Sequence, residues 1–145
     1  MIQSVDSERL MDEIEKQTAK IGRTGIDILL QIHVAQEETK SGFTPDEIVD
    51  LIGKNRVAER WPHLRLRGVM GMASFVDDAE QWRKEFRAIR ACHKALLDGP
   101  LKAQGIGQEQ FNILSYGMSE DYPVAIEEGS NMVRIGTSIF GPRVY

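Results

Sequence analysis

Residues 112–141, NILSYGMSEDYPVAIEEGSNMVRIGTSIFG, are the stretch that decides the fold. Two short apolar runs, which we expect to be strands, each end here in a turn of small residues, LSYGMS (114–119) and RIGTSIFG (134–141). Both turns offer hydroxyl groups, backbone N–H groups and glycines, which together suit a phosphate group. A phosphate site in the last strand-to-helix loops is typical of a (β/α)8 barrel, so the stretch predicts an α/β fold of that kind.

Upstream of this stretch, strand-like and helix-like patterns alternate. Expected strands cover 2–5, 27–34, 66–72, 111–114 and 132–135, and expected helices cover 7–21, the segment from Thr44, the segment from Asp77, and 122–128. Thr44 and Glu47 form a predicted capping box, and Asp77 with Glu80 a second one. Five strands that alternate with four helices predict a parallel sheet with right-handed crossovers.

The chain is short for a complete barrel. Its 145 residues are enough for a single domain, 1–145, with a real core. A full barrel of eight strand–helix units usually needs roughly 200 residues or more. We therefore expect a partial (β/α)8 TIM-type barrel of about five parallel strands with helices, in which the first three strand–helix units are absent.

Composition excludes several classes of protein. The net charge of -4 argues against a nucleic-acid partner. One cysteine, Cys92, excludes an internal disulfide and suits a reducing compartment. No apolar run approaches the roughly 20 residues that cross a membrane. The three histidines and Cys92 show no metal-ligand spacing. We expect a cytoplasmic protein without a metal site.

Strand alternation directs one arginine into the predicted barrel. Val133 and Ile135 are expected to face the helices, so Arg134 faces inward, where a guanidinium group needs an acceptor. That acceptor is either a protein carboxylate such as Asp27 or a ligand. Taken singly, the small polar residues of the two turns are compatible with ordinary turns. Two such turns beside an inward arginine favour a site for phosphate or sulfate, built from Ser115, Ser119, Arg134, Gly136 and Thr137.

Three segments carry a resemblance to a known family. Residues 114–141, together with EETKSGF (37–43) and LRGVMGM (66–72), resemble the pyridoxal phosphate homeostasis proteins (the YggS/PROSC family), which share the barrel of the alanine racemase N-terminal domain. The resemblance implies pyridoxal 5'-phosphate as cofactor. It implies that Arg134 faces the pyridine nitrogen, that Gly136 and Thr137 hold the phosphate, and that Ser115 and Ser119 complete the phosphate cradle.

The chain departs from the family pattern at three places. Tyr116 stands where the family usually has Met, and His33 where Asn is common. The Schiff-base lysine of the family lies on its first barrel strand, upstream of residue 1, and no lysine of this chain matches its motif. Lys40 is the one plausible local amine, and we predict that it does not serve as the Schiff-base lysine.

Three hypotheses about function follow. The first is a non-catalytic protein that binds pyridoxal phosphate in intracellular homeostasis of this cofactor and carries the phosphate- and pyridine-binding half of the site. The second is a fragment of a racemase-like enzyme that depends on pyridoxal phosphate. The third is a truncated half-barrel that self-associates through its open sheet edge.

Overall fold

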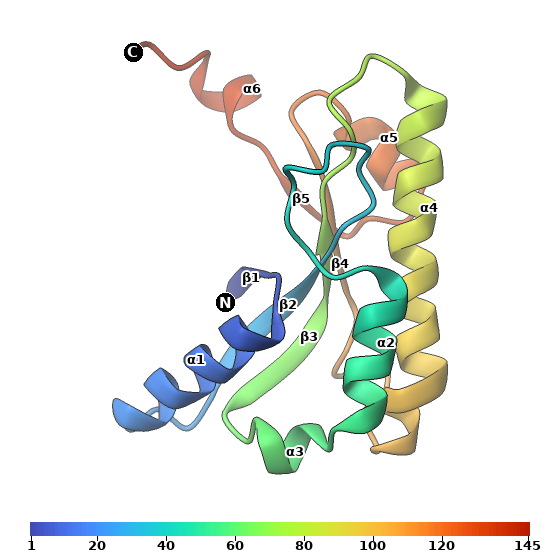
Figure 1. Cartoon of the computed structure of the whole chain (residues 1–145). Coiled ribbons are helices and arrows are strands. Elements are labelled where there is room, and N and C mark those ends of the chain that lie inside the picture. Colours follow the sequence, from blue (N-terminus) through green and yellow to red (C-terminus); the bar gives the residue numbers. More distant parts are fainter.

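The computed structural model describes residues 1–145 and contains one parallel sheet with helices packed on it (Figure 1). The strands are β1 (Ile2–Val5), β2 (Ile26–Ile32), β3 (Leu64–Gly71), β4 (Ile113–Met118) and β5 (Met132–Arg134). The helices are α1 (Glu8–Lys20), α2 (Pro45–Lys54), α3 (Val57–Arg60), α4 (Ala79–Leu96), which continues into a π-helical segment η1 (Leu97–Leu101), α5 (Tyr122–Glu127) and α6 (Thr137–Phe140).

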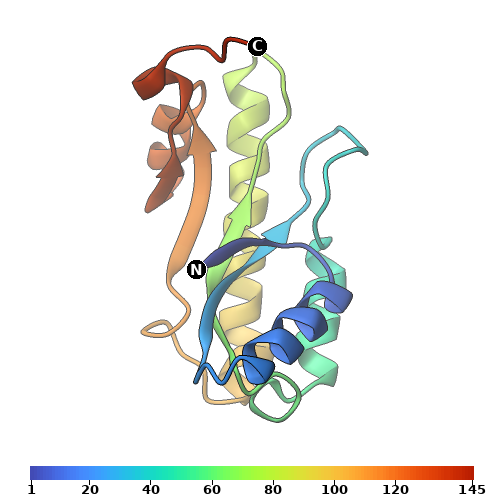
Figure 2. The same cartoon turned by 90° about the vertical axis from the view of Figure 1, so that its left-hand side faces the viewer.

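The sheet confirms the predicted topology. Its strands lie in the order β1-β2-β3-β4-β5, and every neighbouring pair is parallel. The sheet is curled into a half-barrel, so the prediction of a partial TIM-type barrel is confirmed. Because all five strands run the same way, the loops that follow them gather at one end of the sheet, at the top of Figure 1. Figure 2 shows the curl of the strands in front of α4.

The two outer strands of the half-barrel pair on one side only. β1 pairs with β2 and β5 pairs with β4, and neither has a second neighbour. Unpaired strand edges are the geometry that self-association through a sheet edge requires. That self-association stays a prediction.

The hydrophobic core lies between the sheet and the helices. Ile28, Leu30 and Ile32 of β2 belong to it, and the alternation of side chains along a strand puts Gln31 on the opposite, inner face. The ring of Tyr116 on β4 stacks on Phe86 of α4 with centroids 5.0 Å apart. These contacts hold α4 against the middle of the sheet and so position the loops at both of its ends.

A bulge interrupts β3 at Gly68. Ile28 of β2 pairs with Leu66 but Leu29 pairs with Gly68, so Arg67 is one extra residue in β3. Gly68 has φ +156, and a Cβ atom added there would lie 1.9 Å from the carbonyl oxygen of Ile113 on β4. The bulge therefore depends on a residue without a side chain.

Two sequence-based expectations about local structure were wrong. Residues 115–118 were expected to form a turn, but they continue β4. The ring of Tyr116 packs on Phe86 of α4, and this contact keeps the segment in the sheet. Asp77 was expected to cap the next helix, but Asp78 does so, accepting hydrogen bonds from the N–H groups of Glu80 and Gln81. The capping box of Thr44 and Glu47 is confirmed.

None of the helices combines the length and the apolar character that a membrane crossing requires. No three histidine, cysteine or carboxylate side chains come together as potential metal ligands.

Candidate functional site

A hollow of about 310 Å³ lies at the carboxyl ends of the strands, where barrel proteins place their sites. Four loops line it. The β2–α2 loop contributes Lys40, and the β3–α4 loop contributes residues 73–75, backed by Trp82 of α4. The end of β4 and the loop after it contribute residues 118–121, and β5 with its following turn contributes Arg134, Gly136 and Thr137. The structure thus brings Ser119, Arg134, Gly136 and Thr137 into one hollow, which Ser115 does not line. The predicted role of these residues in binding a cofactor stays a prediction.

Arg134 crosses the inner face of the sheet from β5. Its Nη1 donates to the backbone oxygen of Ser115 at 3.3 Å and to the Ser115 hydroxyl at 3.2 Å, and its Nη2 donates to the backbone oxygen of Gly71 at 3.0 Å. A guanidinium group has five N–H donors, so these three bonds leave two for another acceptor. The inward orientation predicted for Arg134 is therefore confirmed.

No carboxylate neutralises Arg134 through an ion pair. Asp27 instead binds Arg65, with Oδ1 2.7 Å from Nε, so the suggested pair of Arg134 with Asp27 was wrong. The two residues lie at opposite ends of their parallel strands, since Asp27 is near the start of β2 and Arg134 is at the end of β5. Burial lowers the pKa of Arg134, and the nearby Asp121 carboxylate opposes this shift. The group still carries its charge at neutral pH, as arginine does in proteins.

Ser119 ties the two turns together. Its hydroxyl oxygen accepts hydrogen bonds from the N–H groups of Gly136 and Ser138, each at 3.3 Å. The turn after β5 is thereby folded back onto the loop after β4. Gly136 and Thr137 are exposed beside it, and a Cβ atom at Gly136 would meet no protein atom within 4 Å. This turn is therefore exposed, with space around Gly136, while the N–H groups of Gly136 and Ser138 are occupied by Ser119.

We predict that Ser119→Ala loosens the turn after β5. The loss of one acceptor for two amides is expected to speed hydrogen exchange at Gly136 and Ser138 by roughly fivefold, the equivalent of about 1 kcal/mol for a hydrogen bond. Amide exchange measured by NMR checks this, with Ser119→Thr as the control that keeps the hydroxyl. Equal exchange rates in both variants would show that Ser119 does not hold the turn.

Ser115 lies deeper than the sequence suggested. It belongs to β4, is fully buried, and donates its hydroxyl hydrogen to Oε1 of Gln3 at 2.8 Å while accepting from Arg134. Gln3 comes from β1, so this bond spans the inner face of the half-barrel. The hydroxyl of Ser115 therefore positions Arg134. Any contact between Ser115 and a phosphate group stays a prediction.

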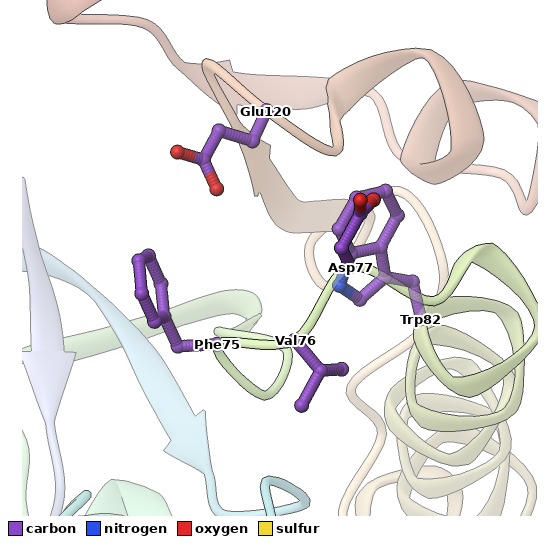
Figure 3. Close-up of a pocket in the computed structure, with 5 residues that line it drawn as sticks. All are labelled: Phe75, Val76, Asp77, Trp82 and Glu120. Atoms are coloured by element: carbon purple, nitrogen blue, oxygen red, sulfur yellow. The ribbon is translucent and has the colours of Figure 1, made fainter.

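A second hollow of about 480 Å³ adjoins the first one. Figure 3 shows its lining, with Phe75, Val76 and Asp77 from the β3–α4 loop, Trp82 from α4, and Glu120 on the other side from the β4–α5 loop. Phe75, Trp82 and Glu120 line both hollows. The site is therefore wider than a phosphate group and has an aromatic wall.

Lys40 and His33, two residues noted in the comparison with the family pattern, differ in their position relative to the hollow. The Nζ atom of Lys40 donates to the backbone oxygen of Ala73 at 2.6 Å and lies 3.6 Å from Oε2 of Glu37. His33 follows β2, and its Nδ1 atom is buried without a hydrogen-bond partner. Of these two residues, only Lys40 lines the hollow.

Sequence reasoning missed several residues of this site. Gln3, Asp121 and Ser138 contact or neighbour the predicted residues, but their patterns are those of an ordinary strand, a helix start and a turn. The wall formed by residues 73–75 also had no motif. The sequence does indicate that Asp121 lies at a helix start, because it precedes the Tyr122-Pro123 pair that opens α5. It therefore could have been placed at the end of the β4–α5 loop, next to the predicted site.

Comparisons with known proteins point to one family. A family model described as the alanine racemase N-terminal domain matches residues 1–144. The chain is 35% identical over 144 residues to a pyridoxal phosphate homeostasis protein of Haemophilus influenzae, covering 99% of this chain and 56% of that protein. A human protein of the same name is 32% identical over 147 residues, covering 100% of this chain and 51% of that protein.

A solved structure shares the fold. PipY of Synechococcus elongatus, with pyridoxal phosphate bound, superimposes with a TM-score of 0.79 at 25% identity, covering 97% of this chain and 60% of that one. The chain spans about half the length of the curated relatives it matches.

Proposed function

The chain belongs to the alanine racemase N-terminal domain family and, within it, to the pyridoxal phosphate homeostasis proteins, and from this premise we propose that it binds pyridoxal phosphate without turning over a substrate. Its role would be to take part in intracellular homeostasis of the cofactor. The relatives named for this function and the bound cofactor in PipY support the proposal.

One observation carries the proposal. The half-buried guanidinium of Arg134 has no carboxylate partner and lies in the same hollow as Ser119, Gly136 and Thr137. A buried positive charge without an ion pair is costly, and an anionic or strongly accepting ligand removes that cost. The hydroxyl groups of Ser119 and Thr137 beside it are common partners of a phosphate monoester. The donor set therefore fits the phosphate and the ring of pyridoxal phosphate.

Each group has a separate part in the proposed complex. Ser119, Gly136 and Thr137 would hold the phosphate, and Arg134 would donate one of its two remaining N–H groups to the pyridine nitrogen. When bound, pyridoxal phosphate supplies an aldehyde and an electron-accepting ring. Since arginine does not give up its proton, it would leave the ring nitrogen unprotonated, and the ring would then accept electrons less well. That arrangement favours storage of the cofactor over chemistry on it.

We propose that binding to this chain is non-covalent. Lys40 is the amine in the hollow, but its Nζ donates to the backbone oxygen of Ala73 and lies 3.6 Å from Oε2 of Glu37. These contacts hold Nζ against one wall of the hollow, and an ammonium group has no lone pair with which to attack an aldehyde. The fit of this chain to the cofactor therefore covers the phosphate and the ring, but not a covalent anchor.

Titration of the purified chain with pyridoxal phosphate tests the proposal. We expect a saturable change in cofactor absorbance at one site per chain, reversed by excess inorganic phosphate. After borohydride reduction, the mass of the protein is expected to be unchanged. Absence of saturable binding would refute the proposed function, and a reduced adduct on Lys40 would refute its non-covalent form. Racemisation of amino acids above background would favour the enzyme alternative.

A further inference from the structure

The carboxylate of Glu85 on α4 is buried, with 3% of the residue exposed, and its hydrogen-bond partners are the uncharged residues Ser74 and Gln81. It accepts hydrogen bonds from the N–H of Ser74 at 2.7 Å, from the hydroxyl of Ser74 at 2.5 Å and from the amide nitrogen of Gln81 at 2.8 Å. A buried carboxylate is costly unless donors satisfy it, and bonds to a charged acceptor are the stronger ones. Glu85 therefore fixes Ser74 in one position.

Ser74 is also hydrogen-bonded to a second loop. Its hydroxyl oxygen accepts from the N–H of Gln36 in the β2–α2 loop at 2.8 Å, and its backbone oxygen accepts from Nε1 of Trp82 at 3.3 Å. Gln36 and Ser74 are 38 residues apart in sequence. One side chain on α4 thus connects, through Ser74, the loops that follow β2 and β3.

The connected loops form one wall of the candidate site. Lys40 comes from the first loop, Ser74 and Phe75 come from the second, and Trp82 backs them from α4. In Figure 3 this wall, represented by Phe75 and Trp82, lies opposite Glu120 of the β4–α5 loop. A further tie joins the loops, because the N–H of Phe75 donates to Oε1 of Glu37 at 2.6 Å.

The opposite wall is held by other bonds. Ser119 holds Gly136 and Ser138, and Ser115 with Gly71 holds Arg134, without a contact to Ser74 or Glu85. The part of the site suited to phosphate is thus built independently of the aromatic wall.

We propose that Glu85 and Ser74 are positioning residues that set the aromatic wall of the site, and that this wall selects ligands with a ring over a bare phosphate ion. The inference rests on the proposed function, since it concerns recognition of the ring of pyridoxal phosphate. Neither residue needs to reach the reactive end of the ligand. Their contribution is the placement of Phe75, Trp82 and Lys40 around it.

Glu85→Gln in the full 145-residue chain tests the proposal. The amide keeps the size of the side chain but replaces one acceptor oxygen by a donor. We expect pyridoxal phosphate to bind about tenfold more weakly, as loss of one bond to a charged acceptor predicts, while affinity for inorganic phosphate changes less than about twofold. Hydrogen exchange at the Gln36 amide, measured without ligand, is expected to rise about tenfold through the lost constraint on Ser74.

Glu128→Gln is the matched control. Glu128 is also a buried carboxylate, with 8% of the residue exposed, but it binds Arg83 and Arg87, away from the two loops. This variant is expected to lose stability without changing the ratio of the two affinities or exchange at Gln36.

The outcomes separate this inference from the proposed function. A folded Glu85→Gln variant with an unchanged affinity ratio and unchanged Gln36 exchange would overturn the inference. A proportional loss of both affinities would also overturn it, since it would show a general structural role. If the unmodified chain binds neither ligand, the proposed function fails and ring selection fails with it. Exchange at Gln36 would in that case still show whether Glu85 couples the two loops.

Discussion

Replacement of Arg134 by glutamine is expected to weaken binding of pyridoxal phosphate by about 30-fold, the equivalent of roughly 2 kcal/mol for bonds to a charged group. Arg134 is the one guanidinium in the hollow, and two of its N–H groups remain after its bonds to Ser115 and Gly71. Glutamine can still donate to one backbone oxygen, so the fold should persist, but the charge and the remaining donors are lost. Absorbance titration of the folded variant measures the effect.

The control for this prediction is Arg65→Gln. Arg65 lies on β3 near the opposite end of the sheet, where it binds Asp27 and is largely exposed. A surface pair of this kind contributes little to stability. Its replacement should leave cofactor affinity unchanged within about twofold, an effect below roughly 0.4 kcal/mol. If both variants bind the cofactor as tightly as the unmodified chain, Arg134 does not contact the ligand.

Replacement of Gly68 by alanine is expected to destabilise the chain by at least about 3 kcal/mol, a loss at the upper end for single substitutions. The added Cβ atom would lie 1.9 Å from a backbone oxygen of β4, and the φ of +156 is unfavourable for alanine. Backbone of a central strand cannot move aside as a side chain can. The bulge would have to open and separate β3 from β4. Chemical denaturation followed by circular dichroism measures the free energy of unfolding.

Gly107→Ala is the control for the loss at Gly68. A Cβ atom at Gly107 would meet no atom within 4 Å, and its φ lies outside the left-handed region. We expect a change within about 0.5 kcal/mol, as for most surface substitutions. Similar stabilities of the two variants would mean that β3 and β4 tolerate a side chain at the bulge.

The order and direction of the strands could be predicted because both follow from local patterns. Alternation of strand and helix signals predicts parallel neighbours, and the observed sheet has that order. The inward orientation of Arg134 followed from parity within a single strand. The bulge at Gly68 was missed, although a glycine inside a strand pattern is its usual signal.

The features that escaped prediction depend on contacts between distant segments. β4 extends to Met118 because Tyr116 stacks on Phe86 of α4, 30 residues earlier in the chain. The partners of Arg134 are mostly backbone oxygens on two other strands, which no pattern of side chains reveals. Asp77 and Asp78 are neighbours of the same residue type, and Asp78 is the one that caps α4. Sequence patterns predict the exact first residue of a helix less reliably than the presence of the helix.

The bond between Ser115 and Gln3 has a consequence for the order of events during synthesis. It joins residues 112 positions apart, and the bond from Arg134 to Gly71 spans 63 positions. Contacts between such distant residues form late, because a long stretch of chain must first be ordered. A nascent chain that has not yet released β5 from the ribosome lacks the bonds from Arg134 to Ser115 and Gly71. The hydrogen bonds across the inner face of the half-barrel are therefore completed only after β5 has joined β4.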